Sequence, residues 1–438
     1  MPGADPRRGG GAVAAAGLRW PAGVTASALA LAVAVAGGCA RPPQGVVFHA
    51  GEAPAKLSQW NLFTRSGTRL VPSPGVLPYE LNSPLFSDHA HKLRTVWMPD
   101  GVAAPYHDSD VLDLPVGTVL SKTFYYPLAS SSEGSAEGSA EGSARSSGAA
   151  LAVLASRPGE PAPSPLEDLG AVVLLETRLL VRHADGWDAL PYVWNAEQTE
   201  ARLTMVGAAF DLELAPTTTG GGPGGTGADA EALRYFVPDR NQCGGCHVTD
   251  HSSGALQPIG IRARHLDRAA PASPAAPPGA ADQLTLWHLE GYLEGLPASG
   301  RGTPAAVWWD TDQPLESRAR AYLDINCAHC HNPAGAADTS GLLLDADAGL
   351  EAMGRCKPPI AAGRGTGDRR FSIVPGDAEA SILLFRMRSR DPGVAMPELG
   401  RSTVHHEGAA LIAEWIDSMQ GDCGHTRAGV TGTLRTGG

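Results

Sequence analysis

The chain has 438 residues and a formal net charge of −12 at pH 7, and 18% of its residues are charged. A chain of this length exceeds one ordinary hydrophobic core, so we expect two or three domains. The acidic balance argues against nucleic acid as a partner, and it fits either a soluble protein that docks on a basic patch of its partner or a charge that serves solubility alone.

The first predicted segment, residues 1–38, has the pattern of a bacterial lipoprotein signal peptide. Arginines near the N-terminus precede a short apolar run that ends in small residues. Residues 36–39, Ala-Gly-Gly-Cys, resemble a lipobox, whose cysteine receives the lipid that anchors a protein to the membrane. Cleavage without lipid is the alternative, because Ala36 stands where leucine is usual. We expect an exported lipoprotein anchored through Cys39, and Ala40 in place of aspartate favours the periplasmic face of the outer membrane.

Residues 55–235 alternate between short apolar runs and turn residues, which is typical of β-strands. Two of the runs flank Asp185-Gly186, a dipeptide that favours a hairpin turn. Strands and helices do not alternate here, so the sequence predicts an antiparallel β-sandwich-like N-terminal domain. The expected strands are residues 93–98, two strands around a turn within 112–126, the hairpin 172–182 and 187–194, and a further pair at 201–205 and 210–214.

Two segments interrupt this domain. Residues 130–166 contain a repeated Glu-Gly-Ser-Ala tetrapeptide followed by Pro-rich sequence, and residues 217–228 are rich in Gly and Thr. Neither segment has enough apolar residues to offset the entropy of ordering. We therefore expect both to be disordered surface insertions.

Histidines of the β-rich domain have aspartates beside them. The run Asp88-His-Ala-His91 could supply metal ligands, and His107 is followed by Asp108. A third ligand cannot be placed, so surface histidines are favoured over a metal site. We expect this domain to bind or dock rather than to catalyse.

Two Cys-x-x-Cys-His motifs follow, and this motif is the attachment signature for c-type haem. Two thiols three positions apart can add across the two vinyl groups of one porphyrin, which leaves the histidine beneath the iron as its proximal ligand. A zinc ribbon is the alternative, but its Cys pairs stand about 15–20 residues apart, and Cys246 and Cys327 are much farther apart. The motifs predict two covalently attached haem c groups, held by Cys243, Cys246 and His247 and by Cys327, Cys330 and His331.

Residues 236–312 form the predicted first haem module. An Ala/Pro-rich linker precedes an amphipathic helix expected over residues 283–295. The spacing indicates no single sixth ligand for the iron at His247. His265, His288 and a vacant position all stay open.

Residues 313–425 form the predicted second haem module. A helix over 314–324 leads into the second motif, another begins within 374–384, and a helix over 404–419 ends the region. Helix, Cys-x-x-Cys-His, Met-Pro and final helix is an order similar to that of a class I cytochrome c, so we expect an all-α cytochrome c-like C-terminal region. In this order Met396 becomes the sixth ligand of the second iron, with a core methionine as the alternative.

Two of the seven cysteines, Cys356 and Cys423, have no role in the motifs or in the predicted lipid anchor. Leftover thiols pair readily in an oxidising periplasm, so we expect a Cys356–Cys423 disulfide. Two buried free thiols are the alternative.

Six runs carry a further resemblance: Leu57-Ser-Gln-Trp-Asn-Leu-Phe63, Pro84-Leu-Phe-Ser-Asp88, Pro115-Val-Gly-Thr118, Glu176-Thr-Arg-Leu-Leu180, Asn241-Gln-Cys243 and Tyr322-Leu-Asp-Ile-Asn-Cys327-Ala-His-Cys-His-Asn-Pro333. Together they resemble a little-characterised family of bacterial diheme c-type cytochrome-like proteins, over residues 55–423. That family joins a β-rich front to two haem sites. The resemblance implies haem binding at both motifs and names no substrate.

Two functions fit these predictions. The first is electron transfer between periplasmic redox proteins, without catalytic residues. The second is a diheme haem enzyme, peroxidase- or dehydrogenase-like, in which the first iron is open and the β-rich domain binds substrate or partner. Electron transfer is favoured, because the sequence indicates a sixth ligand for one iron and indicates no catalytic residues.

Overall fold

The structure is a computed structural model that describes residues 45–129, 150–157, 159–160, 162–215, 230–271, 282–360 and 362–424. The predicted signal peptide, Cys39 and the predicted insertion at 217–228 lie outside these residues. Among the described residues, no helix is long and apolar enough to cross a membrane.

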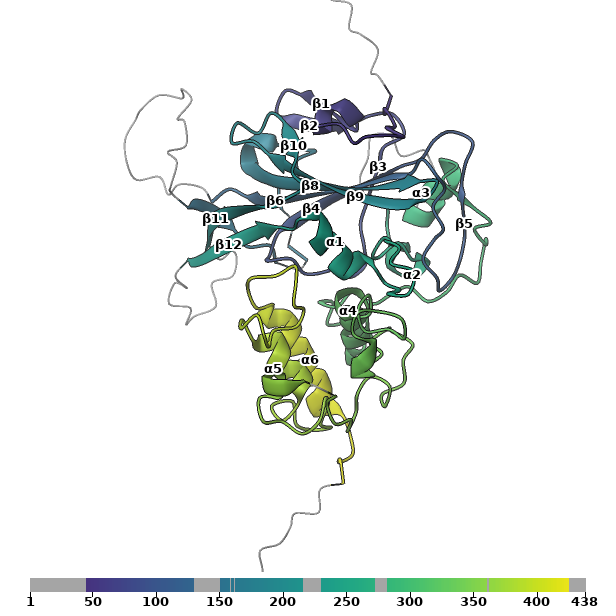
Figure 1. The fold of residues 1–438 in the computed structure, drawn as a ribbon. Coiled ribbons are helices and arrows are strands. Elements are labelled where there is room, and N and C mark those ends of the chain that lie inside the picture. Colours follow the sequence, from purple (N-terminus) through teal and green to yellow (C-terminus); the bar gives the residue numbers. More distant parts are fainter. Residues whose placement is uncertain are drawn as a thin grey trace, which may run out of the picture. The chain divides into compact units, whose positions relative to one another are not determined.

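A six-stranded antiparallel sheet is the largest element of the described fold (Figure 1). Its strand order is β10-β9-β8-β6-β4-β3. Valine, leucine and aromatic residues are frequent in these strands, and such side chains pack well on a pleated surface. The strands are β3 (Leu77–Tyr79), β4 (His91–Trp97), β6 (Val119–Pro127), β8 (Val172–His183), β9 (Gly186–Trp194) and β10 (Ala201–Leu203).

A second sheet of three strands shares a hydrophobic core with the first. Phe124 and Leu175 of the larger sheet pack in one cluster with Leu212 and Tyr235 of the smaller. The smaller sheet has the order β12-β11-β7, with β7 (Leu151–Leu154) parallel to β11 (Ala208–Ala215) and β12 (Glu231–Val237) antiparallel to it. Two-stranded pairs are formed by β1 (Phe63–Ser66) with β2 (Arg69–Pro72) and by β5 (Ala104–Pro105) with β13 (Leu293–Glu294).

The hairpin expected around Asp185-Gly186 is confirmed as β8 and β9, but other strand predictions are wrong. The strands expected at 201–205 and 210–214 do not pair, because β10 pairs with β9 whereas β11 pairs with β12 and β7. The insertion predicted over 130–166 is too long. Its part at 130–149 lies outside the described residues, but Leu151–Leu154 form β7, since Val153 is fully buried in the shared core.

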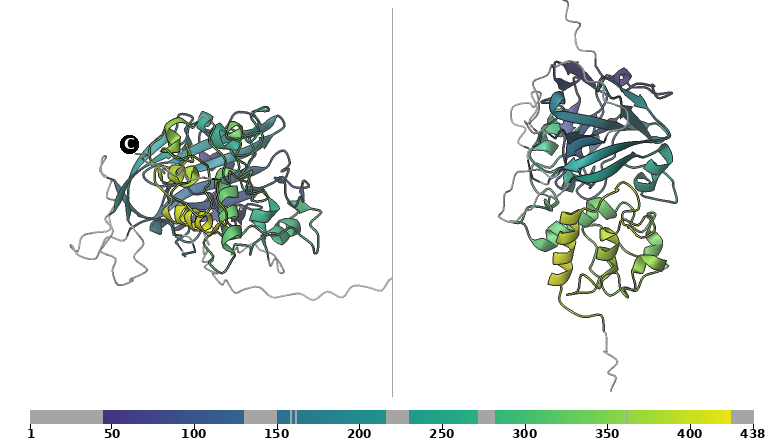
Figure 2. Two further views of the ribbon diagram at one scale, coloured as in Figure 1. Left: turned by 90° about the horizontal axis from the view of Figure 1, so that it is seen from below. Right: turned by 90° about the vertical axis from the view of Figure 1, so that its left-hand side faces the viewer.

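The described helices carry the motifs and the C-terminal part of the chain. They are α1 (Arg240–His247), α2 (Ala263–Leu266), α3 (Gln283–Leu289), α4 (Leu315–Cys327), α5 (Ile382–Arg388) and α6 (His406–Ser418), with 3-10 turns at Leu57–Trp60, Leu169–Ala171, Asp338–Ser340 and Gly363–Thr366. Leu323 of α4, Leu384 of α5 and Trp415 of α6 belong to one hydrophobic cluster. These three helices gather on one side of the six-stranded sheet (Figures 1 and 2).

The predicted fold class is wrong. The described chain is β-rich, and no all-α cytochrome c-like C-terminal region is evident. From residue 313 onward, the three helices are joined by long irregular segments with isolated β-bridges, Arg355 to Ile373 and Phe371 to Ser381. These segments are rich in glycine at positive φ, such as Gly354 at 106°, and helices do not continue through such positions. The parallel pairing of β7 with β11 also departs from a purely antiparallel sandwich.

One core joins the front of the chain to both motif regions. Tyr79 of β3 and Val96 of β4 pack in the same cluster as Leu266 of α2, Trp287 of α3 and Ile325 of α4. The rings of Tyr79 and Trp287 meet edge-on, with centroids 5.7 Å apart. Because these side chains share one core, the sheet fixes where α4 delivers the second motif.

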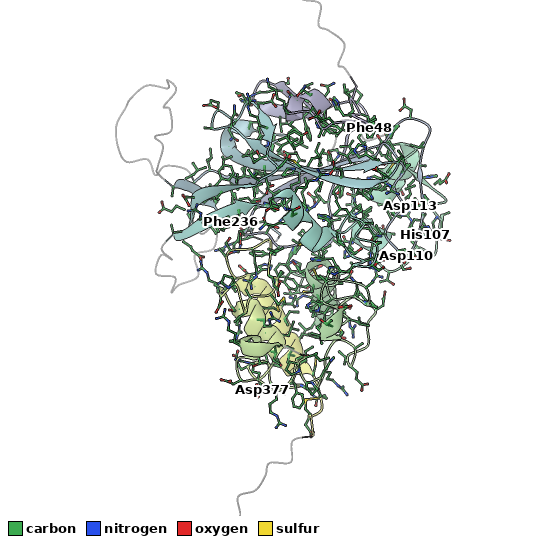
Figure 3. All side chains as sticks on the ribbon, viewed as in Figure 1. Phe48, His107, Asp110, Asp113, Phe236 and Asp377 are labelled. Atoms are coloured by element: carbon green, nitrogen blue, oxygen red, sulfur yellow. A yellow bond between two sulfur atoms is a disulfide. The ribbon has the colours of Figure 1, made fainter. Side chains whose placement is uncertain are left out.

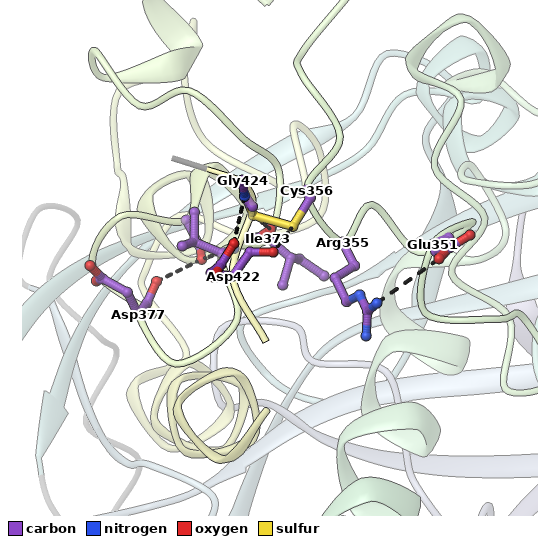
Figure 4. Close-up of a disulfide and its surroundings, with 10 residues drawn as sticks. Glu351, Arg355, Cys356, Ile373, Asp377, Asp422 and Gly424 are labelled. Carbon is purple, nitrogen blue, oxygen red and sulfur yellow. Dashed lines mark hydrogen bonds and ion pairs between the residues drawn. A yellow bond between two sulfur atoms is a disulfide. The ribbon is translucent and has the colours of Figure 1, made fainter. Parts of the chain in front are cut away.

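A disulfide links Cys356 to Cys423, the pair expected from the sequence (Figure 4). The backbone N–H of Cys356 donates to the carbonyl of Ile373 at 2.9 Å, and the amide of Gly424 donates to the Asp422 side chain at 2.7 Å. The bond spans 67 residues of sequence and joins the segment after α6 to the irregular segment before α5.

Candidate cofactor site

The first motif lies on α1, which begins at a capped end. The Asp239 side chain accepts from the backbone N–H of Gln242 at 2.8 Å, and the Gln242 side chain accepts from the Asp239 N–H at 3.0 Å. This reciprocal capping box satisfies donors that a helix start leaves unpaired. Cys243 and Cys246 therefore stand one helical turn apart, on neighbouring positions of the same face.

The second motif begins at the last residue of α4. The backbone N–H groups of Cys330 and His331 both donate to the carbonyl of Cys327, at 3.1 and 2.9 Å, so the chain turns tightly after the helix. Asn326 directly precedes Cys327, and its side chain accepts a hydrogen bond from the backbone N–H of Phe86 at 2.8 Å. That bond fixes the motif to the segment before β4.

The ring hydrogen bonds of His247 and His331 define their tautomers. His247 Nδ1 lies 2.7 Å from the carbonyl of Gln257, which can only accept, so Nδ1 carries the hydrogen. His331 Nδ1 lies 3.2 Å from Ser340 Oγ, whose own hydrogen goes to the carbonyl of Ala337 at 2.6 Å. In both rings Nε2 is left with its lone pair, the arrangement typical of metal-ligating histidine.

Burial keeps these two imidazoles neutral. It lowers the pKa of His247 to about 3, assisted by the charge of Lys122, and it lowers the pKa of His331 to about 4, assisted by Arg386. A histidine binds a metal in its neutral form. Both rings therefore meet the electronic requirement for a ligand.

One cavity of about 920 Å³ brings the predicted site residues together. This volume lies at the upper end of the range for ligand pockets. The Sγ of Cys330 lies 3.5 Å from the carbonyl oxygen of Gly245, so the two motifs are in contact. The predicted residues in the lining are Cys243, Cys246, His247, Cys327, Cys330, His331 and Met396.

Met396 is held in the lining by its backbone. Its N–H donates to the carbonyl of Arg386 at 3.0 Å, and its carbonyl accepts from the Arg401 guanidinium at 2.9 Å. The side chain is half-buried, and Met387 of α5 lines the same cavity. Two thioethers, rather than one, are therefore available to the cavity.

His265 and His288, which the sequence left open as ligands, do not line the cavity. His265 Nε2 lies 2.8 Å from Asp324 Oδ2, and both side chains are buried. His288 Nδ1 donates to the carbonyl of Leu293 at 2.8 Å. The structure instead brings to the lining His329, which lies inside the second motif, and His405, and neither was predicted from the sequence.

His405 lies in an aromatic group on the cavity wall. Its Nδ1 lies 3.0 Å from the hydroxyl of Tyr322, and its ring stacks on Phe86 with centroids 4.1 Å apart. Burial lowers the pKa of His405 to about 3 and that of His329 to about 4. Both are neutral imidazoles in the wall of the cavity.

The histidines of the β-rich region are not gathered into a site. His107 is exposed at the edge of this region, as Figure 3 shows. His91 is half-buried against Tyr125, with ring centroids 5.5 Å apart, so it is not the surface residue that we expected. Within the part of the chain that the structure describes, no group of three or more His, Cys, Asp or Glu side chains could hold a metal ion.

Comparisons of the chain with known protein families, with curated proteins and with solved structures give no match. The resemblance to a diheme family therefore stays a prediction.

The donor set around the cavity fits haem c. The four motif cysteines are free thiols, whereas the other two cysteines of the described chain form the disulfide. Burial raises the pKa of Cys327 and of Cys330 to about 12, so both sulfurs keep their hydrogens at neutral pH. Two thiol pairs, two neutral histidines with free Nε2 and a thioether share one cavity, which is what two covalently attached haem groups require.

Proposed function

We propose that this protein is an electron carrier with two covalently attached haem c groups. The observation that carries the proposal is the single cavity lined by all six motif residues and by Met396. Haem, when bound, supplies an iron that exchanges single electrons. The contact between Cys330 and Gly245 keeps the two attachment motifs close, and a short separation favours electron transfer between two centres.

The chain's own residues have distinct roles in this proposal. The motif thiols would hold the haem groups covalently, each by addition across one vinyl group, which consumes no oxidant. His247 and His331 would bind iron through Nε2, because Gln257 and Ser340 hold their Nδ1–H groups. Met396 would supply a thioether to the second haem, and a thioether favours the ferrous state.

The proposed location is the periplasmic face of the outer membrane, with periplasmic redox proteins as partners. The Cys356–Cys423 disulfide supports an oxidising compartment. The lipid on Cys39 would hold the protein at the membrane. Cys39→Ser should move the protein from the membrane fraction to the soluble periplasmic fraction with its haem content unchanged.

The central test is the mass and the Soret absorption of the exported protein, produced in a host that attaches haem c. The wild-type chain should gain the mass of two haem groups. Replacing Cys243 and Cys246 by serine should remove one, and replacing Cys327 and Cys330 should remove the other. Replacing Cys356 and Cys423 is the matched control and should remove none. A wild-type chain without Soret absorption and without added mass would contradict the proposal.

A second function, a diheme peroxidase- or dehydrogenase-like enzyme, is favoured by one observation. Neither His265 nor His288 lines the cavity, so the iron at His247 has no sixth ligand among the residues expected from the sequence. Electron paramagnetic resonance of the oxidised protein separates the two functions. Two low-spin signals support electron transfer, and a high-spin signal from the first haem supports the enzyme.

A further inference from the structure

The cavity is positively charged although the chain is acidic. The whole sequence has a formal net charge of −12. Five basic side chains line the cavity against two acidic ones, Asp88 and Glu398. A cavity in which one sign of charge predominates favours a ligand of the opposite sign.

Two of the five basic side chains, Arg386 and Arg401, lie in the C-terminal segment and have partners there. Arg401 donates to the carbonyls of Thr403 and Met396, both at 2.9 Å. Arg386 donates to the carbonyl of Val394 at 2.8 Å and lies 3.7 Å from Glu398. The structure therefore accounts for the charges beside the second motif.

The other three basic side chains form a row across the six-stranded sheet. Arg94 of β4 stands directly opposite Lys122 of β6, and Lys122 stands directly opposite Arg178 of β8. Like charges that face one another on adjacent strands destabilise a sheet. This cationic row, Arg94, Lys122 and Arg178, therefore works against the stability of the sheet.

A carboxylate neutralises only one of the three positive charges in the row. Arg178 binds the buried Glu176 through two hydrogen bonds, at 2.8 and 2.6 Å. Neither the ammonium of Lys122 nor the guanidinium of Arg94 makes a hydrogen bond or ion pair with another described residue. Lys122 lies over the Phe124 ring at 5.4 Å, a contact that is weaker than a counter-ion.

The pKa of Lys122 is lowered, as expected for a cation that no carboxylate binds. Burial, followed by the charges of Arg178 and Arg94, lowers the pKa of Lys122 to about 7. Arg94 is buried, with 7% of its surface exposed, and Lys122 is half-buried. Buried cations are expected to be paired, so the cavity side of the row suits an anion.

The row lies beside the first motif. Arg240 of α1 pairs with Asp188 of β9 at 2.7 Å, and β9 pairs directly with β8, which carries Arg178. The basic side chains of the C-terminal segment, Arg386 and Arg401, are instead bonded to carbonyls within residues 394–403. An anion on the row would therefore belong to the group attached at Cys243 and Cys246.

We propose that Arg94, Lys122 and Arg178 form an anion-binding wall for the carboxylate side chains of the haem attached at Cys243 and Cys246. This assignment rests on the proposed function, because the carboxylates belong to that cofactor. The wall orients the first haem in the cavity. Its positive charges would also favour the reduced state of that haem.

Midpoint potentials of the complete two-haem protein test the wall. Lys122→Gln and Arg94→Gln should each lower the potential of one haem and leave the other unchanged, because each removes a positive charge near one iron. Lys122→Arg keeps the charge and should keep the wild-type potential. Lys92→Gln is the matched control: Lys92 lies on the same strand as Arg94 but does not line the cavity, and its ammonium donates to the carbonyl of Ala90.

The outcomes separate this assignment from the proposed function. Two haems per chain, with potentials unchanged in both Gln variants, would overturn the wall and leave the electron carrier intact. An equal shift in Lys92→Gln would also overturn it, because any loss of charge would then suffice. A wild-type chain without haem would overturn the proposed function and the wall with it. A thermal melt of each variant shows whether its fold is retained.

Discussion

Single hydrogen bonds decide which histidines are ready to bind a metal. Gln257 and Ser340 take the Nδ1–H of the two motif histidines, which leaves each Nε2 as an acceptor. His265 uses its Nε2 on Asp324 instead. Histidines of the same chain thus differ in chemistry because their nearest neighbours differ.

Met396→Leu should open the sixth position of the second iron in the holoprotein. A thioether that favours the ferrous state is lost, so the midpoint potential of that haem falls and a high-spin signal appears. Met387→Leu is the matched control, because Met387 lines the same cavity. Electron paramagnetic resonance and potentiometry check both variants. A low-spin spectrum in Met396→Leu would show that another side chain is the ligand.

Asp324→Ala should destabilise the protein by about 3 kcal/mol, because it leaves His265 buried without its partner. Urea unfolding measures this loss. The double variant with His265→Ala should recover part of it, since neither partner is then left unpaired. Equal losses in the single and double variants would show that the pair is not coupled.

The stability from Asp324 should also depend on pH. Burial alone would raise the pKa of Asp324, but the hydrogen bond from His265 and the charges of Arg262 and Arg264 outweigh it and hold the pKa below its ordinary value. A lowered carboxyl pKa gives stability that is present above the unfolded-state pKa, about 3.9, and is lost as pH falls through the folded pKa. Below about pH 4, unfolding free energy should therefore fall more steeply in the wild type than in Asp324→Asn.

The motif helices are positioned by their ends and by their packing. A capping box starts α1 at Asp239, and the core around Tyr79 and Trp287 holds Ile325 of α4. Neither helix is long, so packing and capping stabilise them more than helix propensity does. The spacing of the cysteines can place two thiols beside one cofactor only because these helices form.

Asp239→Ala should cost about 1 kcal/mol of unfolding free energy, the usual loss for an N-cap. The loss should be accompanied by a change in the spectrum of the first haem, because α1 begins to fray beside Cys243. Asp168→Ala removes the cap of the 3-10 turn at Leu169–Ala171 and is the matched control. It should change stability without changing either haem spectrum. Identical spectra in both variants would contradict a role for the cap in the site.

At the scale of the whole molecule, the cavity lies where the six-stranded sheet meets the two motif regions. Its lining combines strands β4, β6 and β8 with α1, the end of α4 and the segment that carries Met396. The disulfide fixes the C-terminal end of the described chain, because it joins the residues after α6 to the segment before α5. The site therefore depends on contacts made along most of the described chain.

Replacing both Cys356 and Cys423 by serine should lower the unfolding free energy by about 4 kcal/mol, which is the loop-closure entropy expected for a bond spanning 67 residues. Urea unfolding checks the value. Both haems should stay attached, because neither cysteine belongs to a motif. Loss of a haem with full retention of stability would contradict this division of roles.

The sequence by itself determined the features that depend on neighbouring residues. The two motifs follow from a fixed spacing, the hairpin of β8 and β9 follows from Asp185-Gly186, and the helix that became α6 follows from its apolar periodicity. The disulfide pair followed from which thiols were left over. Each of these signals lies within a short stretch of chain or in a count of residues.

Only the tertiary structure decided the fold class, the parallel pairing of β7, the partner of His265 and the alignment of the cationic row. Strand register placed Arg94, Lys122 and Arg178 opposite one another, and no spacing within one strand predicts this. Burial of Val153 made a strand in a segment that composition alone predicted to be disordered. The physical reason is common to all four: register and burial depend on segments far apart in sequence, and local patterns do not encode which segments will meet.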